Sequence, residues 1–532
     1  MTIDRRRFLQ LGMTATGGVV LFGCSSDDTT STADSNDGTG PAVTDAPGGS
    51  ATADVAPSGT DAASTGGSIR IGALASPADT LNPASATGLL DYMVLYHVHD
   101  SLQILQGGTV TNQLAESIEP NNDATEWTVT LVDGATFHDG APVTAADVVY
   151  SLTLLASSAN FAQFYAAADL DNIEIVDDRT LVIPLLAPRG DFADTTFAQL
   201  SFVVPDGFTD WGNNIGSGPY TLVSYEPGVG AKLERNPDYW GTPALLDTLE
   251  FVAIADAPTR LNALKSGEID FASGVDAIGA AAEEGNDAIE IRRGSQAEST
   301  MRCFALNVNQ APFDNPDVVR AVKLAIDRQA LIDVVLLGSG ELGNDIPSAG
   351  LPGYPAGIAQ TERDVDTARE LFEAAGVTEF TIRAADFLPG VVASCELFAQ
   401  QLAEAGVTVT IDEADPTTYF DDFATVLSTP AQGFFFINRP GVIHVASYTG
   451  SSSPFNITGF GTPTYDATVA DMQATVDADE RVTKTEELLT TLHEEDGLII
   501  WGFDPQLDAA VPGIEGVELV QSVPVFWRAT RA

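Results

Sequence analysis

The sequence is poor in positive charge. Its 532 residues include 24 lysines and arginines against 75 aspartates and glutamates, so the formal net charge is −51. Only four of the basic residues are lysines, namely Lys232, Lys265, Lys323 and Lys484. Because phosphate binding needs clustered lysine and arginine, we expect no nucleic-acid partner. High acid content with little lysine is typical of adaptation to salt, which screens the repulsion between like charges.

Cysteine is also rare, with three residues in the chain: Cys24, Cys303 and Cys395. Cys303 lies in a predicted strand and Cys395 in a predicted helix of a different segment. We therefore expect these two to be buried free thiols, with a disulfide between them as the alternative.

The five histidines do not form an evident metal site. His97 and His99 share a spacing that could bind a metal, but their apolar neighbours indicate a buried helix. His138, His444 and His493 lack paired partners. Because a dedicated metal site needs several converging ligands, we expect neither a metal nor a cofactor.

Common catalytic motifs are missing from the sequence. It contains no G-x-S-x-G elbow, no H-E-x-x-H and no Walker sequence. We therefore expect no enzyme, and an extracytoplasmic hydrolase is the weak alternative from another class.

The longest apolar run near the start, Leu9 to Phe22, is too short to span a bilayer, which takes about 20 residues. It follows Arg5 and Arg6 in a stretch that resembles a twin-arginine export signal. Residues 21–24, LFGC, resemble a lipobox. We expect residues 1–24 to be a signal that ends at Cys24, whose lipidated thiol anchors the mature protein.

Residues 25–67 have the composition of a tether. They are mainly serine, threonine, alanine, glycine, proline and aspartate, with no lysine, arginine or aromatic residue. Such a segment buries too little apolar surface to offset the entropy lost on ordering. The prediction is a disordered leash that holds a globular body at the outer face of the cell membrane.

The most informative stretch runs from Trp127 to Leu152. Trp127, Val129 and Leu131 alternate with threonines, which predicts a half-buried strand. The Asp-Gly pair at 133–134 predicts a hairpin turn. Farther on, residues 144–147, TAAD, form a capping box that opens a helix.

This stretch, with its F-H-D-G at 137–140, closely resembles the fingerprint of family 5 extracytoplasmic solute-binding proteins, the peptide- and nickel-binding receptors of ABC importers. Further matches in the family's order are L-N-P at 81–83, L-A-E-S at 114–117, G-S-G-P-Y at 216–220, R-N-P-D-Y-W at 235–240 and S-G-E-I-D at 266–270. The resemblance covers nearly all of the chain beyond residue 67.

The middle of the chain has the pattern of an α/β unit. Apolar residues at three- and four-residue spacing predict one long helix from Pro316 to Val334 and a second from Val365 to Ala375. A strand at 380–384, a helix at 393–405 and a strand at 407–411 form a βαβ unit, which implies a parallel sheet covered by helices.

The resemblance implies an α/β, two-lobed periplasmic-binding-protein-like (Venus-flytrap) fold. Its first lobe is discontinuous, here residues 68–308 and 497–532, and its second lobe is the inserted segment 309–496. Two crossing strands act as the hinge, and the ligand sits in the cleft between the lobes. The implied function is an extracytoplasmic receptor, expected to be a monomer, that delivers a di- or oligopeptide to the permease and ATPase subunits of an ABC importer.

The ligand contacts are expected on several segments. In peptide-binding members of the family, a second-lobe strand leads to an aspartate that pairs with the ligand ammonium. The corresponding stretch here, residues 433–441, contains no aspartate and offers Asn438 and Arg439 instead. An arginine suits a carboxylate better than an ammonium, although a surface salt bridge is the alternative for Arg439. The full set of candidate ligand-binding residues is Asn82, Pro83, Phe387, Phe436, Asn438, Arg439 and Trp501.

The missing aspartate leaves the ligand open. Either the ammonium of a peptide is bound elsewhere, or the ligand is a non-peptide carboxylate or a nickel–chelate complex bound as an organic ligand.

Overall fold

A computed structural model describes residues 66–532, apart from residues 159–160, 417 and 421. The predicted signal at 1–24, its lipidated Cys24 and nearly all of the tether at 25–67 lie outside the described residues. Within the described residues, every helix is too short or too polar to cross a membrane.

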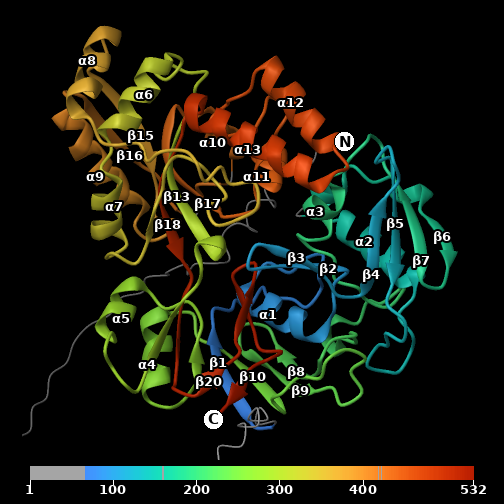
Figure 1. Ribbon diagram of the computed structural model, residues 1–532. Coiled ribbons are helices and arrows are strands. Elements are labelled where there is room, and N and C mark those ends of the chain that lie inside the picture. Colours follow the sequence, from blue (N-terminus) through green and yellow to red (C-terminus); the bar gives the residue numbers. More distant parts are fainter. Residues whose placement is uncertain (1–65, 159–160, 417, 421) are drawn as a thin grey trace, which may run out of the picture.

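Two large sheets divide the molecule (Figure 1). The first has seven strands, in the order β12 (Glu290–Arg293), β19 (Leu507–Ala510), β11 (Phe271–Ala272), β1 (Ser68–Ala73), β10 (Thr248–Ala253), β9 (Gly230–Arg235) and β8 (Tyr220–Glu226). The second has six, in the order β14 (Glu341–Leu342), β18 (Leu498–Pro505), β13 (Ser299–Leu306), β17 (Ala431–Ile437), β15 (Glu379–Ala384) and β16 (Thr408–Glu413).

Lobe I denotes the seven-stranded sheet with its helices and the smaller sheets joined to it. Its helices are α1 (Leu89–Val98), α2 (Ala145–Ala156), α3 (Phe192–Thr196), α4 (Ala257–Lys265) and α5 (Ala277–Ala282). A four-stranded sheet has the order β4 (Ala115–Pro120), β5 (Glu126–Leu131), β7 (Thr180–Pro184) and β6 (Glu174–Asp177). The paired short strands are β2 (Gln103–Gln106) with β3 (Thr109–Asn112), β20 (Ile514–Glu515) with β23 (Thr530–Arg531), and β21 (Glu518–Val520) with β22 (Val523–Val525).

Lobe II denotes the six-stranded sheet and its helices. Phe304, Ile499 and Trp501 point from β13 and β18 into a core with α6 (Pro316–Ala325), α7 (Arg328–Val335), α8 (Val365–Ala375) and α9 (Val391–Glu404). Cys303 and Ile500, the neighbours along these strands, point into a separate core on the other face, as the alternation of a strand requires. The remaining helices are α10 (Phe423–Ser428), α11 (Gly441–Tyr448), α12 (Pro463–Ala474) and α13 (Ala478–Glu495).

The chain crosses between the lobes twice. It leaves lobe I after β12 and enters β13, and it returns where β18 ends at Pro505 and β19 begins at Leu507. The two crossings are tied together, because the Gly294 N–H donates to the Gln506 carbonyl at 2.8 Å. Both β13 and β18 belong to the lobe II sheet, so the crossings lie outside the expected 309–496 insert. The division of the chain into lobes at 308 and 497 stays a prediction.

The βαβ unit of lobe II agrees with the sequence pattern. β15 and β16 are parallel, with Phe380 opposite Val409, and α9 connects them. α8 ends at Gly376 in the left-handed conformation, with φ of 69°. Cys303 and Cys395 are both buried and free, as predicted.

Two local predictions were wrong. The helix expected to run from Pro316 to Val334 is broken into α6 and α7, because Asp327 begins a new helix and accepts a hydrogen bond from the Ala330 N–H at 2.9 Å. The strand at Trp127 does not form a hairpin through Gly134. Its partners are β4, which immediately precedes it in the sequence, and β7, which follows only at Thr180–Pro184.

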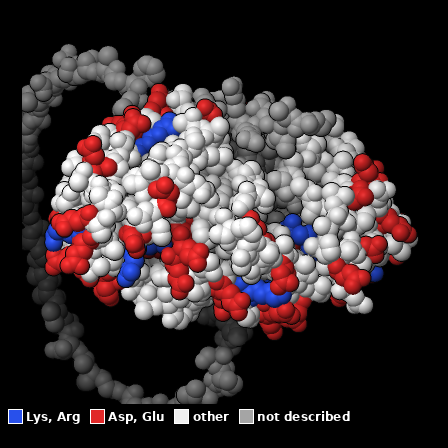
Figure 2. Space-filling view, turned by 90° about the horizontal axis from the view of Figure 1, so that it is seen from above, with Lys and Arg blue, Asp and Glu red and all other residues white. Residues whose placement is uncertain are grey.

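Acidic side chains are spread widely over the surface. Figure 2 shows them across the visible face, with only a few lysines and arginines among them. On this face the acidic side chains are dispersed and not gathered in one patch, and their like charges repel one another.

Candidate ligand-binding site

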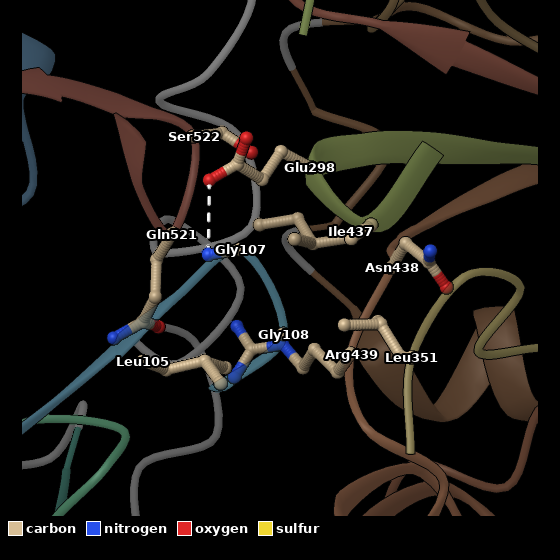
Figure 3. Close-up of a pocket in the computed structure, with 11 residues that line it drawn as sticks. Leu105, Gly107, Gly108, Glu298, Leu351, Ile437, Asn438, Arg439, Gln521 and Ser522 are labelled. Atoms are coloured by element: carbon tan, nitrogen blue, oxygen red, sulfur yellow. Dashed lines mark hydrogen bonds between the residues drawn. The ribbon is translucent and has the colours of Figure 1, made fainter. Parts of the chain in front are cut away.

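A pocket lies between the two lobes, next to the crossings (Figure 3). Lobe I contributes the β2–β3 turn and the β21–β22 turn, and lobe II contributes the end of β17. The 3-10 turn η5 (Gln296–Glu298), which leads into β13, forms another wall. The lining residues are Leu105, Gly107, Gly108, Ala297, Glu298, Leu351, Ile437, Asn438, Arg439, Gln521 and Ser522.

The lobes are in contact around this pocket. At one side of the molecule, Arg481 of α13 pairs with Asp194 of α3 at 2.9 Å. The Gly190 N–H also donates to the Gln473 carbonyl at 2.7 Å. The pocket volume is about 20 Å³, which is room for roughly one water molecule. In this closed arrangement the lobes are in contact, and the pocket between them is too small for a solute larger than about one water molecule.

Arg439 is the cation of the pocket. It follows β17, and its Nη1 donates to the Gln199 side-chain oxygen of lobe I. Its buried Nε has no hydrogen-bond partner among the described residues, and no carboxylate of the described chain forms an ion pair with it. A partly buried guanidinium that lacks a carboxylate costs free energy until an anion arrives. The surface salt bridge considered from sequence is thus not seen within the described residues.

Lobe I places further polar groups beside Arg439. The side-chain Nε2 of Gln199 is buried without a hydrogen-bond partner among the described residues. Burial raises the pKa values of Tyr92 and Tyr96 on α1, and the nearby Arg439 opposes both rises. Gln521 donates to the carbonyls of Ala198 and Gln199 and so fixes the segment that carries the Gln199 side chain.

Asn438 does not contact lobe I as the neighbouring Arg439 does; it is bonded to backbone groups of η5 and of lobe II. Its Nδ2 donates to the carbonyls of Gln296 and Ala349, both at 2.8 Å, and its backbone N–H donates to the Ser299 carbonyl. These bonds attach the end of β17 to η5. The buried side-chain Oδ1 lacks a partner among the described residues and is left free for a ligand.

Glu298 is a pocket residue that the sequence reasoning missed. Its carboxylate accepts long hydrogen bonds from the Gly107 N–H at 3.4 Å and from the Ser295 hydroxyl at 3.5 Å. Burial raises the pKa of Glu298. The only sequence signal was its place just before a predicted crossing strand, and the chain has many other glutamates.

Phe436 and His444 form an aromatic group next to Arg439. The Phe436 ring lies 5.7 Å from the His444 ring and 5.2 Å from the Tyr448 ring, measured between centroids. Burial, and secondly the charge of Arg439, lower the pKa of His444 to about 3. The imidazole is therefore neutral at neutral pH, and it adds no second cation to this region.

The other predicted site residues are not among those that line the pocket. Phe387 packs against Tyr419 and Phe420 in lobe II, with ring centroids 4.8 and 5.0 Å apart. Trp501 is 1% exposed and lies in the helix-covered core. In lobe I, Pro83 is buried in the loop before α1, and the Asn82 side chain accepts from the Ala84 N–H at 3.0 Å.

The fingerprint motifs build the frame of lobe I. His138 of F-H-D-G donates from Nε2 to the Gly218 carbonyl at 3.0 Å, and its Nδ1 accepts from the Gly216 N–H at 3.2 Å. Tyr239 and Trp240 of the R-N-P-D-Y-W motif both donate to Asp100, at 2.9 and 3.0 Å. The motifs therefore identify a scaffold and carry little information about the ligand.

The histidines are held by the fold. His97 contacts the Met93 carbonyl through Nδ1 and accepts from the Phe526 N–H through Nε2, so both ring nitrogens are occupied. His99 is also buried, and burial lowers its pKa to about 3, so its imidazole is neutral at neutral pH. Among the described residues, no three acidic, cysteine or histidine side chains are grouped as metal ligands.

Comparison with known proteins gives a consistent assignment. Residues 109–436 match the family model described as bacterial extracellular solute-binding proteins, family 5 Middle. The glutathione-binding protein GsiB of Pectobacterium atrosepticum is 30% identical over 321 residues, which are 57% of this chain and 61% of that protein. The match thus spans less than two thirds of the length of this relative. The matched relatives are solute-binding proteins and not enzymes.

Two solved structures resemble the whole described body. The binding protein DppA of Helicobacter pylori, in complex with the peptide STSA, has a TM-score of 0.70 at 19% identity and covers 88% of this chain and 98% of its own. AgaA of A. tumefaciens R10, in complex with agropinic acid, has a TM-score of 0.67 at 25% identity and covers 86% of this chain and 96% of its own. These likenesses confirm the predicted α/β binding-protein fold.

Proposed function

The chain belongs to the bacterial extracellular solute-binding proteins of family 5, and we propose that it captures a di- or oligopeptide outside the cytoplasm for an ABC importer. The single observation that carries the proposal is the pocket between the lobes, lined from both sides and next to the two crossings. Such a pocket places ligand contacts on two bodies that move relative to each other.

Arg439 supplies the anchor for a ligand carboxylate. A carboxylate that enters the pocket replaces the neutral Gln199 oxygen on the guanidinium and gains charge-assisted hydrogen bonds from Nη1 and Nε. The Gln199 amide, freed from Arg439, is then placed to donate its unpartnered N–H to the same carboxylate. One ligand group thus bridges lobe I and lobe II.

This bridge explains how ligand binding drives closure. The open form exposes both walls, and a ligand that contacts both lobes stabilises the closed form more than the open one. The closed shape is the one that we propose docks on the permease. Lipidation at Cys24 after twin-arginine export, followed by the tether at 25–67, would hold the monomeric receptor at the membrane surface.

A non-peptide carboxylate is the second candidate. Arg439 favours any carboxylate, and a relative of the same fold is bound to agropinic acid. A nickel–chelate complex belongs to this same alternative, with its organic carboxylates rather than a protein metal site making the contacts.

The test is a ligand screen by thermal unfolding, with residues 25–532 in concentrated potassium chloride. The ligands are short peptides, free amino acids, opine-like acids and nickel chelates. A ligand that binds the folded state raises the midpoint as RT ln(1 + [L]/Kd). A rise with peptides supports the peptide receptor, and a rise restricted to non-peptide carboxylates or chelates overturns it in favour of the alternative.

A further inference from the structure

We infer that the ligand carries a positive charge as well as a carboxylate, and that Glu298 binds the positive charge while Arg439 binds the carboxylate. The inference rests on the proposed function and adds a specificity for zwitterions. It also assigns the ammonium anchor to the hinge, since the end of β17 carries arginine and no aspartate.

Glu298 has the properties of an anchor that lacks its cation. Its carboxylate lines the pocket, and no lysine or arginine of the described chain forms an ion pair with it. Its two hydrogen bonds, at 3.4 and 3.5 Å, are longer than normal hydrogen bonds and therefore weak, and they leave acceptor capacity free. The raised pKa of Glu298 agrees with a carboxylate whose charge is poorly compensated.

Arg439 and Glu298 are opposite charges in one pocket that do not pair with each other. Figure 3 shows the Glu298 carboxylate beside Gly107 and Ser522, while the Arg439 guanidinium lies at a separate place, toward Leu105 and Gly108. Each charge lacks an oppositely charged partner among the described residues. A single ligand with two opposite charges compensates both of them at once.

The charge balance also disfavours simple anions relative to zwitterions. A ligand with a carboxylate alone would satisfy Arg439 but leave Glu298 uncompensated and close to a second negative charge. The net charge of −51 adds long-range repulsion against anions, which salt screens and which a zwitterion avoids. The pocket therefore selects free-amine peptides or related amino acids over acylated acids.

The hinge and lobe II carry the two charged anchors, and lobe I carries the groups that close onto the ligand. Glu298 precedes β13 in η5, whose Gln296 carbonyl accepts from Asn438 at the end of β17. Asn438 therefore fixes the distance between the acid and the neighbouring arginine within lobe II and the hinge. A ligand that fits this spacing then draws Gln199 and the turn at Gly107 from lobe I onto it.

The test uses a mixture of Ala-Xaa and Ala-Xaa-Ala peptides in which Xaa is uncharged. The mixture is prepared in three forms: with free termini, N-acetylated and C-amidated. Apparent affinities come from thermal midpoints of residues 25–532 and of its Glu298→Gln and Arg439→Gln variants. The exposed Glu373→Gln and Arg320→Gln substitutions are the matched controls, because each makes the same charge change elsewhere on lobe II.

The expected result is a tenfold or greater loss of affinity for the wild type when either terminus is blocked. Glu298→Gln should bind free and N-acetylated peptides equally while still discriminating against the amide, and Arg439→Gln should do the reverse. Equal binding of free and N-acetylated peptides by the wild type overturns the inference but leaves the peptide receptor standing. Binding of none of the three forms overturns both.

Discussion

Arg439 shows how a single side chain can be identified from sequence and then understood from its neighbours. Its place after an apolar strand suggested a carboxylate anchor, whereas its bond to Gln199 across the lobes emerged from the fold. The neutral Gln199 oxygen is a weaker acceptor than a carboxylate, so it is easily displaced by a ligand.

Replacing Arg439 by alanine should weaken binding of a carboxylate ligand by about 10- to 100-fold, since hydrogen bonds to a charged group contribute roughly 1.5–3 kcal/mol. Titration calorimetry with the best ligand of the screen measures the change. Arg320→Ala, which removes an exposed arginine of α6, should leave the affinity unchanged. Equal affinity of Arg439→Ala and the wild type would remove Arg439 from the site.

His444 gives a prediction for pH. Burial lowers its pKa to about 3, below the unfolded value of about 6.5. Below pH 6.5 the unfolded chain therefore takes up a proton that the folded chain does not, and folding stability is lost as the pH falls toward 3. His444→Phe keeps an aromatic ring and removes this proton uptake.

The stability of His444→Phe relative to the wild type should accordingly rise by about 2 kcal/mol between pH 7 and pH 5. Urea unfolding at the two pH values, in the same concentration of potassium chloride, measures the difference. A constant difference would contradict a neutral, buried imidazole. The comparison with wild type cancels the opposing effect of Asp91, whose pKa burial raises to about 7.

At the scale of elements, the break between α6 and α7 depends on the N-cap of α7, Asp327. The Asp327 carboxylate accepts from the Ala330 N–H, and its own N–H donates to the Gln401 side chain of α9. Asp327→Ala should lower the free energy of unfolding by about 1 kcal/mol, the usual cost of losing an N-cap.

Chemical denaturation checks this change, with Asp314→Ala in the exposed preceding loop as the control. Ligand affinity should stay at the wild-type value, because no residue of α7 lines the pocket. A decrease in the free energy of unfolding below 0.3 kcal/mol for Asp327→Ala would contradict the stabilising role of this cap.

Elements with local signals were predictable, and elements that depend on distant partners were not. α9 and the parallel strands β15 and β16 follow from periodicity and glycine stops. The Trp127 strand was recognised, but its distant partner β7 was not, since sequence periodicity does not specify which strands pair. The hairpin turn was expected after this strand, at Gly134, whereas it lies before the strand, between β4 and β5. Likewise Arg439 could be singled out from sequence, because it lies in the stretch where peptide-binding relatives carry an aspartate. Glu298 could be identified only from the fold, which places η5 beside Gly107.

At the scale of the whole molecule, the charge of −51 opposes the compact state. Raising potassium chloride from 0.1 to 2 M shortens the Debye length from about 10 Å to below 3 Å and screens this repulsion. The thermal midpoint of residues 25–532 should therefore rise by several degrees. An uncharged solute of equal osmolality is the control, and a midpoint that falls with salt would contradict the effect.

The two lobes touch each other at points far apart in the sequence. The Arg439–Gln199 contact at the pocket and the Arg481–Asp194 ion pair both join lobe I to lobe II. A ligand must enter an open form and then bring these surfaces together, so the overall dimensions of the molecule should depend on the ligand.

Small-angle X-ray scattering of residues 25–532, with and without the ligand that raises the thermal midpoint most, tests this most directly. Closure of the lobes around the ligand should give a smaller radius of gyration, and a scattering curve of the folded body that matches the closed structure. A midpoint that rises while the radius of gyration stays the same would contradict binding by closure of the lobes.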